Sequence, residues 1–171
     1  TATTEIYTLS LHDALPIYVD EIYRLAVFGN HSPTMFPDLE NTVVDGKNAY
    51  QSINNHDWVE NEFLPRVQQR GAEIIKARGA SSASSAARAA CETVKAVEHP
   101  TRSGDVFNAA VMSDGAYGIP EGIFSGFPLI SDGRGSIEIV RDYNLSDFAK
   151  TGLKKTADEL VAERNLVKDL I

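Results

Sequence analysis

The sequence predicts an α+β domain, in which strands and helices follow one another without the regular alternation of a parallel sheet. Short apolar runs typical of strands occur in separate parts of the chain, and three longer segments show helical periodicity. No Gly-x-Gly-x-x-Gly turn follows a predicted strand, so the chain carries no dinucleotide-binding fingerprint of its own. A length of 171 residues fits one domain with a substantial hydrophobic core.

The first predicted elements are strands. Residues 25–28 form a short apolar run that ends at Gly29-Asn30, which is typical of a strand leading into a turn. Residues 42–44 and 49–53 are predicted to pair as a β-hairpin through Asp45-Gly46, because Asp-Gly favours a tight turn.

Two helices follow in the middle of the chain. The first begins near Pro65, which marks a break or kink, and ends at Gly79, a plausible C-cap. Its apolar face consists of Phe63, Val67, Gly71, Ile74 and Ile75. The second helix covers residues 82–97 and carries a stripe of small residues, namely Ala83, Ala86, Ala87, Ala90, Cys91 and Val94. We expect this stripe to be buried against another element, with Cys91 as a small core residue.

The last third predicts two strands and a long helix. Residues 106–112 and 136–140 are the strands, and the Asp132-Gly133-Arg134-Gly135 turn leads into the second. The helix begins at Ser146, a suitable N-cap. Its expected inner face consists of Leu153, Ala157, Leu160, Val161 and Val167.

Composition excludes several classes of partner. The net charge is −8 with the acidic residues spread along the chain, which argues against nucleic acid or an anionic membrane as the main partner. No apolar run has the length of a membrane span. The single cysteine, Cys91, cannot form an internal disulfide, so we expect a cytoplasmic protein.

His31 is the histidine with the best case for chemistry. It follows the predicted strand directly in Phe28-Gly29-Asn30-His31-Ser32, and strand ends present side chains from a rigid support. A lone histidine is more often structural, and position alone leaves that interpretation open. His56 and His99 lie in polar surroundings and are expected to be exposed to solvent.

Two further segments are candidates for function. Residues 79–86 are rich in serine and alanine, and we favour a Ser-capped helix start over a flexible linker. Free N–H groups and small hydroxyls at such an end suit a carboxylate ligand. Asp114, in the loop after residue 112, could act as an acid or base, although an aspartate that stabilises the turn is commoner. The sequence shows no zinc or calcium pattern and no serine-hydrolase elbow, so no metal is expected.

A resemblance to a known family covers about nine-tenths of the chain. The motifs that carry it are Phe28-Gly29-Asn30-His31-Ser32 with Met35 and Pro37-Asp38, Gly71 with Ile74-Ile75-Lys76-Ala77-Arg78, Ser81-Ser82-Ala83 with Ser85-Ala86-Ala87, Ser113-Asp114-Gly115 with Tyr117-Gly118-Ile119-Pro120-Glu121-Gly122, and Phe127-Pro128. In this order they are similar to the C-terminal half of the cytosolic-type malate dehydrogenases, within the lactate/malate dehydrogenase family. The chain departs from the family at Phe28, where a tryptophan is usual, and at Pro33 and Gly126.

The resemblance implies a fold and a set of roles. It implies the catalytic domain of these enzymes, with antiparallel strands and long helices and without the nucleotide-binding domain. His31 would take the hydroxyl proton when malate is oxidised to oxaloacetate with NAD, and a carboxylate would hold its ring. Ser81 and Ser82 would lie near the substrate, and Asn30 would fix the loop around the histidine. The intact enzyme would be a homodimer.

The first 17 residues do not match the family. They resemble the conceptual translation of a sequencing adapter, so we expect residues 1–17 to be an artefact and residues 18–171 to be the domain. Asp13 is therefore rejected as the partner of His31. The family's nucleotide-binding domain, substrate-binding arginines and histidine-pairing aspartate lie upstream of the matched region. We expect the chain alone to be inactive and prone to aggregation.

Two alternatives remain. A lactate-type dehydrogenase or one of the related sugar-hydrolysing enzymes would share the architecture, although the motifs around Ser81 and Tyr117 favour the malate enzyme. The other alternative is a non-enzymatic remnant or interaction module that keeps the fold.

Overall fold

The computed structural model describes residues 14–15, 21–81 and 83–170. The strands are β1 (Ile22–Tyr23), β2 (Ala26–Phe28), β3 (Phe36–Asp38), β4 (Val43–Val44), β5 (Lys47–Asn48), β6 (Phe107–Met112), β7 (Phe124–Ser131) and β8 (Ile137–Ile139). The helices are α2 (Ala49–Ile53), α3 (His56–Trp58), a π-helical turn (Val59–Phe63), α4 (Leu64–Arg78), α5 (Ala83–Glu98), a 3₁₀ turn (Ala116–Gly118) and α6 (Asp147–Leu166). The predicted boundary after residue 17 lies outside the described residues.

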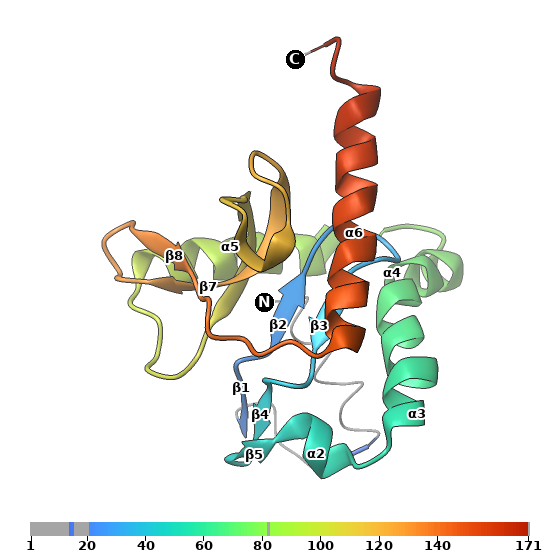
Figure 1. Cartoon of the computed structure of the whole chain (residues 1–171), viewed down its shortest axis with the longest axis vertical. Helices are drawn as coiled ribbons and strands as arrows, with labels where there is room; N and C mark the ends of the chain where they lie inside the picture. The colour runs from blue at the N-terminus through green and yellow to red at the C-terminus, as the bar shows by residue number, and fades with distance from the viewer. Residues whose placement is uncertain (1–13, 16–20, 82, 171) are drawn as a thin grey trace.

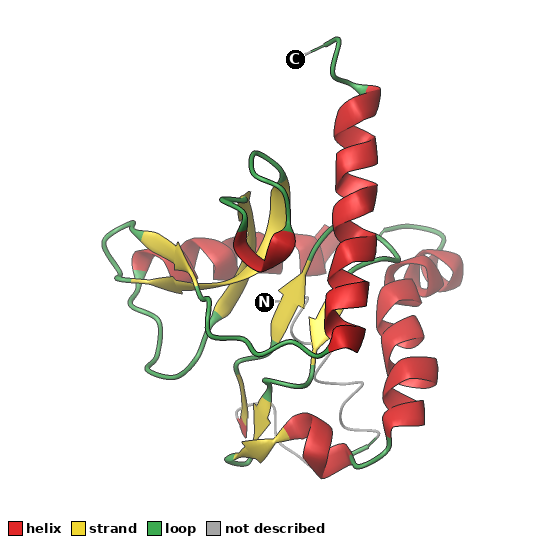
Figure 2. Cartoon of the chain, viewed as in Figure 1, coloured by secondary structure: helices red, strands yellow, loops and turns green. Residues whose placement is uncertain are grey.

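The described strands form three small antiparallel sheets, with the orders β1-β4-β5, β2-β3 and β6-β7-β8. The end of β2 also bridges the middle of β7 through reciprocal hydrogen bonds between Gly29 and Gly126. In Figure 1 the β6–β8 sheet lies on one side of the molecule and α4 on the other, with β2, β3 and α6 between them. Figure 2 shows that strands and helices are interspersed, which confirms the α+β prediction.

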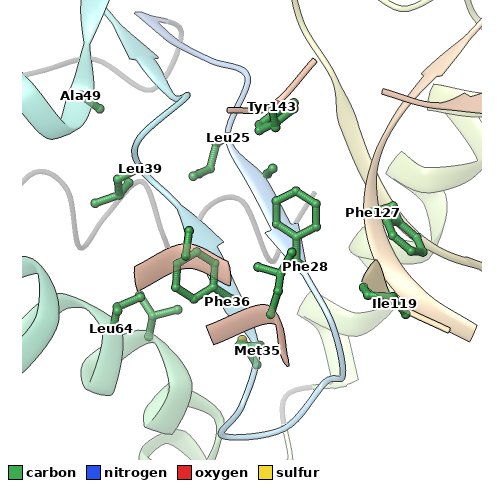
Figure 3. Packing of buried hydrophobic residues seen from close by; sticks show 14 of the residues in the cluster. Leu25, Phe28, Met35, Phe36, Leu39, Ala49, Leu64, Ile119, Phe127 and Tyr143 are labelled. Carbon is green, nitrogen blue, oxygen red and sulfur yellow. The ribbon is translucent and has the colours of Figure 1, made fainter. Parts of the chain in front are cut away.

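The core is formed where β2, β3, β7 and α6 meet (Figure 3). Its largest fully buried side chains are Phe28, Phe63, Phe127, Ile119, Leu129, Leu153, Thr42, Thr156 and Asp38. Phe28 packs edge-on against two tyrosine rings, with centroid distances of 5.0 Å to Tyr117 and 5.9 Å to Tyr143. The phenylalanine that departs from the family pattern is therefore the aromatic centre of this cluster.

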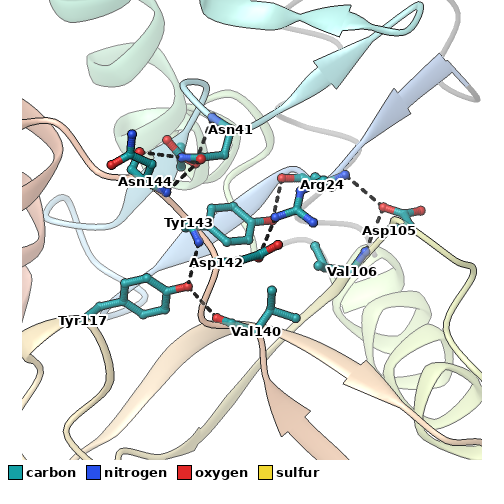
Figure 4. A network of polar contacts seen from close by, with 10 residues as sticks. Arg24, Asn41, Asp105, Val106, Tyr117, Val140, Asp142, Tyr143 and Asn144 are labelled. Atoms are coloured by element: carbon teal, nitrogen blue, oxygen red, sulfur yellow. Dashed lines mark hydrogen bonds and ion pairs between the residues drawn. The ribbon is translucent and has the colours of Figure 1, made fainter.

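A polar network fixes the start of β2 against the segment that leads into α6 (Figure 4). The Tyr117 hydroxyl donates to the Val140 carbonyl at 2.5 Å, and the Tyr143 hydroxyl donates to the Arg24 carbonyl at 2.8 Å. Arg24 forms an ion pair with Asp142 at 2.7 Å, and its guanidinium lies 4.9 Å from the centre of the Tyr143 ring. Burial raises the pKa of Tyr143, so its hydroxyl remains a donor at neutral pH.

Several predicted elements are confirmed. The strand at residues 25–28 is β2, and the strands at 106–112 and 136–140 are β6 and β8. Gly79 ends α4 in the left-handed conformation at φ 70°, as a C-cap glycine does. Ser146 caps α6, its hydroxyl accepting from the Ala149 amide at 3.1 Å. Leu153 and Ala157 are buried as expected, whereas Val167 follows the helix and is 41% exposed.

The predicted β-hairpin is correct at its turn and wrong in its second strand. Asp45 and Gly46 both have positive φ and join β4 to β5. Residues 49–53 form the helix α2, because Asn48 is an N-cap whose side chain accepts from the Gln51 amide at 2.9 Å. The central strand β7 was not among the predicted elements.

The predicted burial of the small-residue stripe on α5 is also wrong. In this chain α5 has no buried residue, Val94 is 62% exposed and Cys91 is exposed. The half-buried positions belong to the opposite face, which includes Ala89, Ala96 and Val97. Cys91 is therefore a surface thiol of this chain.

Candidate functional site

His31 lies in the loop between β2 and β3, two residues after the β-bridge at Gly29. Its side chain is exposed, and it makes no hydrogen bond or ion pair within the part of the chain that the structure describes. The ring is therefore presented outward from the end of a buried strand and has no orienting carboxylate among the described residues.

The turn before His31 requires a glycine. Gly29 has φ +94°, and a Cβ at this position would lie 2.2 Å from Thr156 Oγ1 and 2.3 Å from its methyl carbon. The backbone of the loop thus lies directly on α6. Gly126, the unusual glycine of β7, faces it across the bridge, where a Cβ would lie 3.0 Å from the Val27 carbonyl.

Side chains on one face of α6 hold the loop that carries His31. The Asn30 amide donates to Thr156 Oγ1 at 2.8 Å, and its side-chain nitrogen donates to Glu163 at 2.9 Å and to Glu159 at 3.2 Å. The hydroxyls of Ser32 and Thr34 each donate to Glu159 Oε2 at 2.5 Å. Donation from Ser32, Thr34 and Asn30 lowers the pKa of Glu159, so its carboxylate is ionised at neutral pH.

The serines predicted to bind substrate are not joined to His31 by a described contact. Ser81 is exposed in the segment between α4 and α5, where its carbonyl accepts from the Ala83 amide at 3.1 Å. Ser82 lies outside the described residues. Asn30 is part of the loop, and its hydrogen bonds go to α6 rather than to His31.

The other candidates have structural contacts. Asp114 accepts from the Ala116 amide at 3.2 Å and forms an ion pair with Arg141, which holds the pKa of Asp114 below its ordinary value. This is the expected turn-stabilising role. His56 and His99 are exposed, as predicted.

A cavity of about 400 Å³ lies on the β6–β8 sheet. Its lining residues are Val111, Met112, Asp114, Leu129, Ile137, Glu138, Ile139 and Arg141. None of them belongs to the loop that carries His31.

The described residues show neither a cluster of metal-ligating side chains nor, after β6, a phosphate-binding turn. No three His, Cys, Asp or Glu side chains among them cluster with the geometry of a metal site. The glycine turn that follows β6, with Gly115 and Gly118 at positive φ, leads through a 3₁₀ turn into β7 and not into an α-helix. A nucleotide phosphate therefore finds no glycine-turn and helix-start cradle there.

No helix in residues 21–81 or 83–170 is both long and apolar enough to cross a membrane.

The sequence predicted His31 and Asn30 as site residues but not the α6 residues that contact Asn30 and its neighbours in the loop. Thr156, Glu159 and Glu163 follow at intervals of three and four residues, which places them on one helix face. That spacing can be read from the sequence. The contact with the loop cannot, because the loop lies more than a hundred residues earlier in the chain.

Comparisons with known proteins agree on one family. A family model described as the lactate/malate dehydrogenase alpha/beta C-terminal domain matches residues 16–171. A malate dehydrogenase of Magnetococcus marinus is 46% identical over 153 residues, which are 90% of this chain and 47% of that protein.

Solved structures show the same relationship. The crystal structure of malate dehydrogenase from Naegleria fowleri has a TM-score of 0.90 and 34% identity, covering 99% of this chain and 52% of that one. A lactate dehydrogenase of Trichomonas vaginalis in complex with NADH and oxamate has a TM-score of 0.90 and 26% identity, covering 98% and 52%. The chain thus spans about half the length of the relatives that it matches.

Proposed function

The chain belongs to the lactate/malate dehydrogenase family through its alpha/beta C-terminal domain, and from this premise we propose that it is the catalytic half of an NAD-dependent malate dehydrogenase. The observation that carries the proposal is the 46% identity to a malate dehydrogenase over 90% of the chain. Malate is favoured over lactate because the relative with 46% identity is a malate dehydrogenase, whereas the compared lactate dehydrogenase is 26% identical.

His31 is the proton-transfer group in this proposal. An imidazole titrates near neutral pH, so it can take the hydroxyl proton of malate and return it to oxaloacetate in the reverse direction. The exposed position of His31 at the end of β2 leaves the ring accessible to a substrate. The hydride acceptor, NAD, would be held mainly by a nucleotide-binding half, since this chain has no Gly-x-Gly-x-x-Gly turn after a strand and spans about half the length of its relatives.

The remaining assignments belong to the same proposal. Ser81 and Ser82 would lie near the substrate, and Asn30 would hold the loop. Residues 18–171 would be the domain, and residues 1–17 would be foreign to it. The intact enzyme would be a cytoplasmic homodimer, and the 171-residue chain alone would not turn over malate.

A chimera tests the proposal. The domain (residues 18–171) is fused to the nucleotide-binding half of the Magnetococcus marinus malate dehydrogenase, and oxidation of NADH with oxaloacetate is followed by absorbance. We expect turnover by the chimera and none by the 171-residue chain. His31→Asn should lower kcat by roughly 10²–10⁴-fold, the usual contribution of a general acid or base.

His99→Asn is the matched control, because His99 is exposed and its ring hydrogen-bonds to the Lys95 carbonyl and to no other group among the described residues. It should leave kcat unchanged. A folded chimera without activity would favour the non-enzymatic alternative. Full activity in the His31→Asn chimera would refute the assigned role of His31.

The lactate alternative rests on the equal TM-score of the Trichomonas vaginalis enzyme. A second chimera, with the nucleotide-binding half of that lactate dehydrogenase, is assayed with pyruvate and oxaloacetate. We expect the chimera with the Magnetococcus marinus half, acting on oxaloacetate, to be more active than this second chimera on either substrate. Greater activity of the lactate-derived chimera on pyruvate would support the alternative.

A further inference from the structure

One carboxylate of α6 gathers the hydrogen-bonding side chains that flank His31. Glu159 accepts from Ser32 and Thr34 at 2.5 Å each and from Asn30 at 3.2 Å. Asn30 precedes the histidine and Ser32 follows it, so the loop is held on both sides of the ring-bearing residue. Hydrogen bonds to a charged acceptor are stronger than those between neutral groups.

Glu159 makes these contacts instead of an ion pair. Its side-chain hydrogen-bond partners among the described residues are all neutral loop side chains, and no salt bridge of those residues includes it. Asp158, the preceding residue, shows the usual surface arrangement, an i,i+4 pair with Lys154 at 2.6 Å. The two adjacent acidic residues of α6 therefore have different partners: Asp158 pairs with a lysine on the solvent side, and Glu159 binds the loop.

The neighbouring turns of α6 extend the same contact. Thr156 Oγ1 accepts from the Asn30 amide at 2.8 Å and lies 3.0 Å from the Thr34 hydroxyl oxygen, and Glu163 accepts from the Asn30 side chain at 2.9 Å. The Ser32 hydroxyl in turn accepts from the Thr34 amide at 3.0 Å. Glu159 thus lies at the centre of a network that sets the backbone on both sides of His31.

We propose that Glu159 is the positioning residue for His31, fixing the conformation of the β2–β3 loop from α6 without touching the substrate. The proposal rests on the proposed function for the importance of His31. The contact between Glu159 and the loop is tested without substrate. A failure of the positioning proposal can therefore be distinguished from a failure of the proposed function.

The test compares Glu159→Gln with the wild-type 171-residue chain by amide hydrogen exchange and by the imidazole C–H signals of His31 in NMR spectra. Glutamine removes the charge and turns one acceptor into a donor that faces the loop hydroxyls. Amides of Asn30 and Thr34 should exchange about tenfold faster, as expected for the partial loss of charged hydrogen bonds at a half-exposed site. The His31 signals should shift, while those of His99 stay in place.

Asp158→Asn is the matched control, since it makes the same change in charge one residue away on the solvent side. It should leave the loop amides and the His31 signals as in the wild type. Glu159→Gln should lower the free energy of unfolding by no more than the tenfold change in loop exchange implies, about 1.4 kcal/mol, whereas Asp158→Asn should leave it nearly unchanged.

Two outcomes would overturn the proposal. One is a Glu159→Gln chain whose loop exchange and His31 signals match the wild type. The other is faster exchange along all of α6 while the His31 signals stay as in the wild type, which would make Glu159 a general support of the fold. Should Glu159→Gln fail to fold, Thr34→Val removes one donor from the loop side, and the same local changes are expected from it.

Discussion

Gly29 combines two constraints at a single residue. Its φ of +94° disfavours any side chain, and a Cβ would collide with Thr156. Gly46 shares the first constraint, with φ +71°, but has open space around its Cα. The pair therefore separates the cost of the dihedral angle from the cost of the collision.

Gly29→Ala should lower the free energy of unfolding by about 3 kcal/mol or more, and Gly46→Ala by about 1 kcal/mol. Urea denaturation of both variants measures the difference. Adding Thr156→Ala to Gly29→Ala should restore part of the loss, since it removes the colliding atoms. Equal losses in the two glycine variants would contradict the close contact with α6.

Asp38 makes stability depend on pH. Burial raises the pKa of Asp38 to about 6, despite three hydrogen bonds to its carboxylate from Glu40 and Asn41 that favour the charged form. Because the folded-state pKa lies above the unfolded one, the folded chain binds this proton more tightly. The resulting stability is complete below about pH 4 and is lost as the pH rises through about 6.

We expect this loss to be on the order of 3 kcal/mol, from a shift of about two units. Unfolding is measured in urea between about pH 4 and about pH 7 for the wild type and for Asp38→Asn. The difference between the two free energies should change across this range in the stated direction. A constant difference would show that Asp38 titrates alike in the folded and unfolded chains.

Helix α6 is stabilised by the residue that caps its N-terminus. Ser146 caps the helix through the Ala149 amide and also donates to Glu40 at 2.6 Å. Ser146→Ala should therefore lower the free energy of unfolding by about 1 kcal/mol or slightly more. Thermal unfolding followed by circular dichroism provides the measurement, with Thr151→Ala in the exposed second turn as a control. A loss equal to that of the control would show that the cap contributes nothing.

The sequence predicted the elements whose signals are local. Ser146 and Gly79 mark helix ends by their own chemistry, and both predictions are confirmed. The strand β7 was missed because Gly126 and Pro128 interrupt its pattern, and Gly126 is there to let the backbone at Gly29 approach. The buried face of α5 was assigned wrongly because small residues occupy both of its faces, leaving little apolar contrast.

The candidate site divides in the same way. His31 was predicted from its place at a strand end and from the family resemblance of the residues around it, which are properties of adjacent residues. The contact between Ser32 and Glu159 joins positions 127 residues apart, and no local pattern specifies such a pair. Only the packing of α6 onto the β2–β3 loop reveals it.

At the scale of the whole molecule, the chain exposes many large apolar side chains. Phe124 and Met112 are 61% and 58% exposed and lie opposite each other on β7 and β6. Contiguous exposed apolar surface promotes association, and it does so here against a net charge of −8. The average mass measured by sedimentation should therefore rise with concentration.

Phe124→Lys should reduce this association, because it removes an exposed ring. Thr151→Lys makes the same change in charge at an exposed polar position and should not reduce it. A chain that stays monomeric at every concentration, or equal effects of the two variants, would contradict the prediction.

The hydrogen bonds between α6 and the β2–β3 loop have a consequence for folding during synthesis on the ribosome. Thr156 follows its partner Asn30 by 126 residues, and synthesis at about 5–20 residues per second separates the two by on the order of ten seconds. During that interval β2 can pair with β3, but the loop that carries His31 lacks its hydrogen-bond partners on α6. The loop must therefore be among the last parts of the domain to reach its final conformation. His31 is synthesised well before the α6 residues that fix its loop.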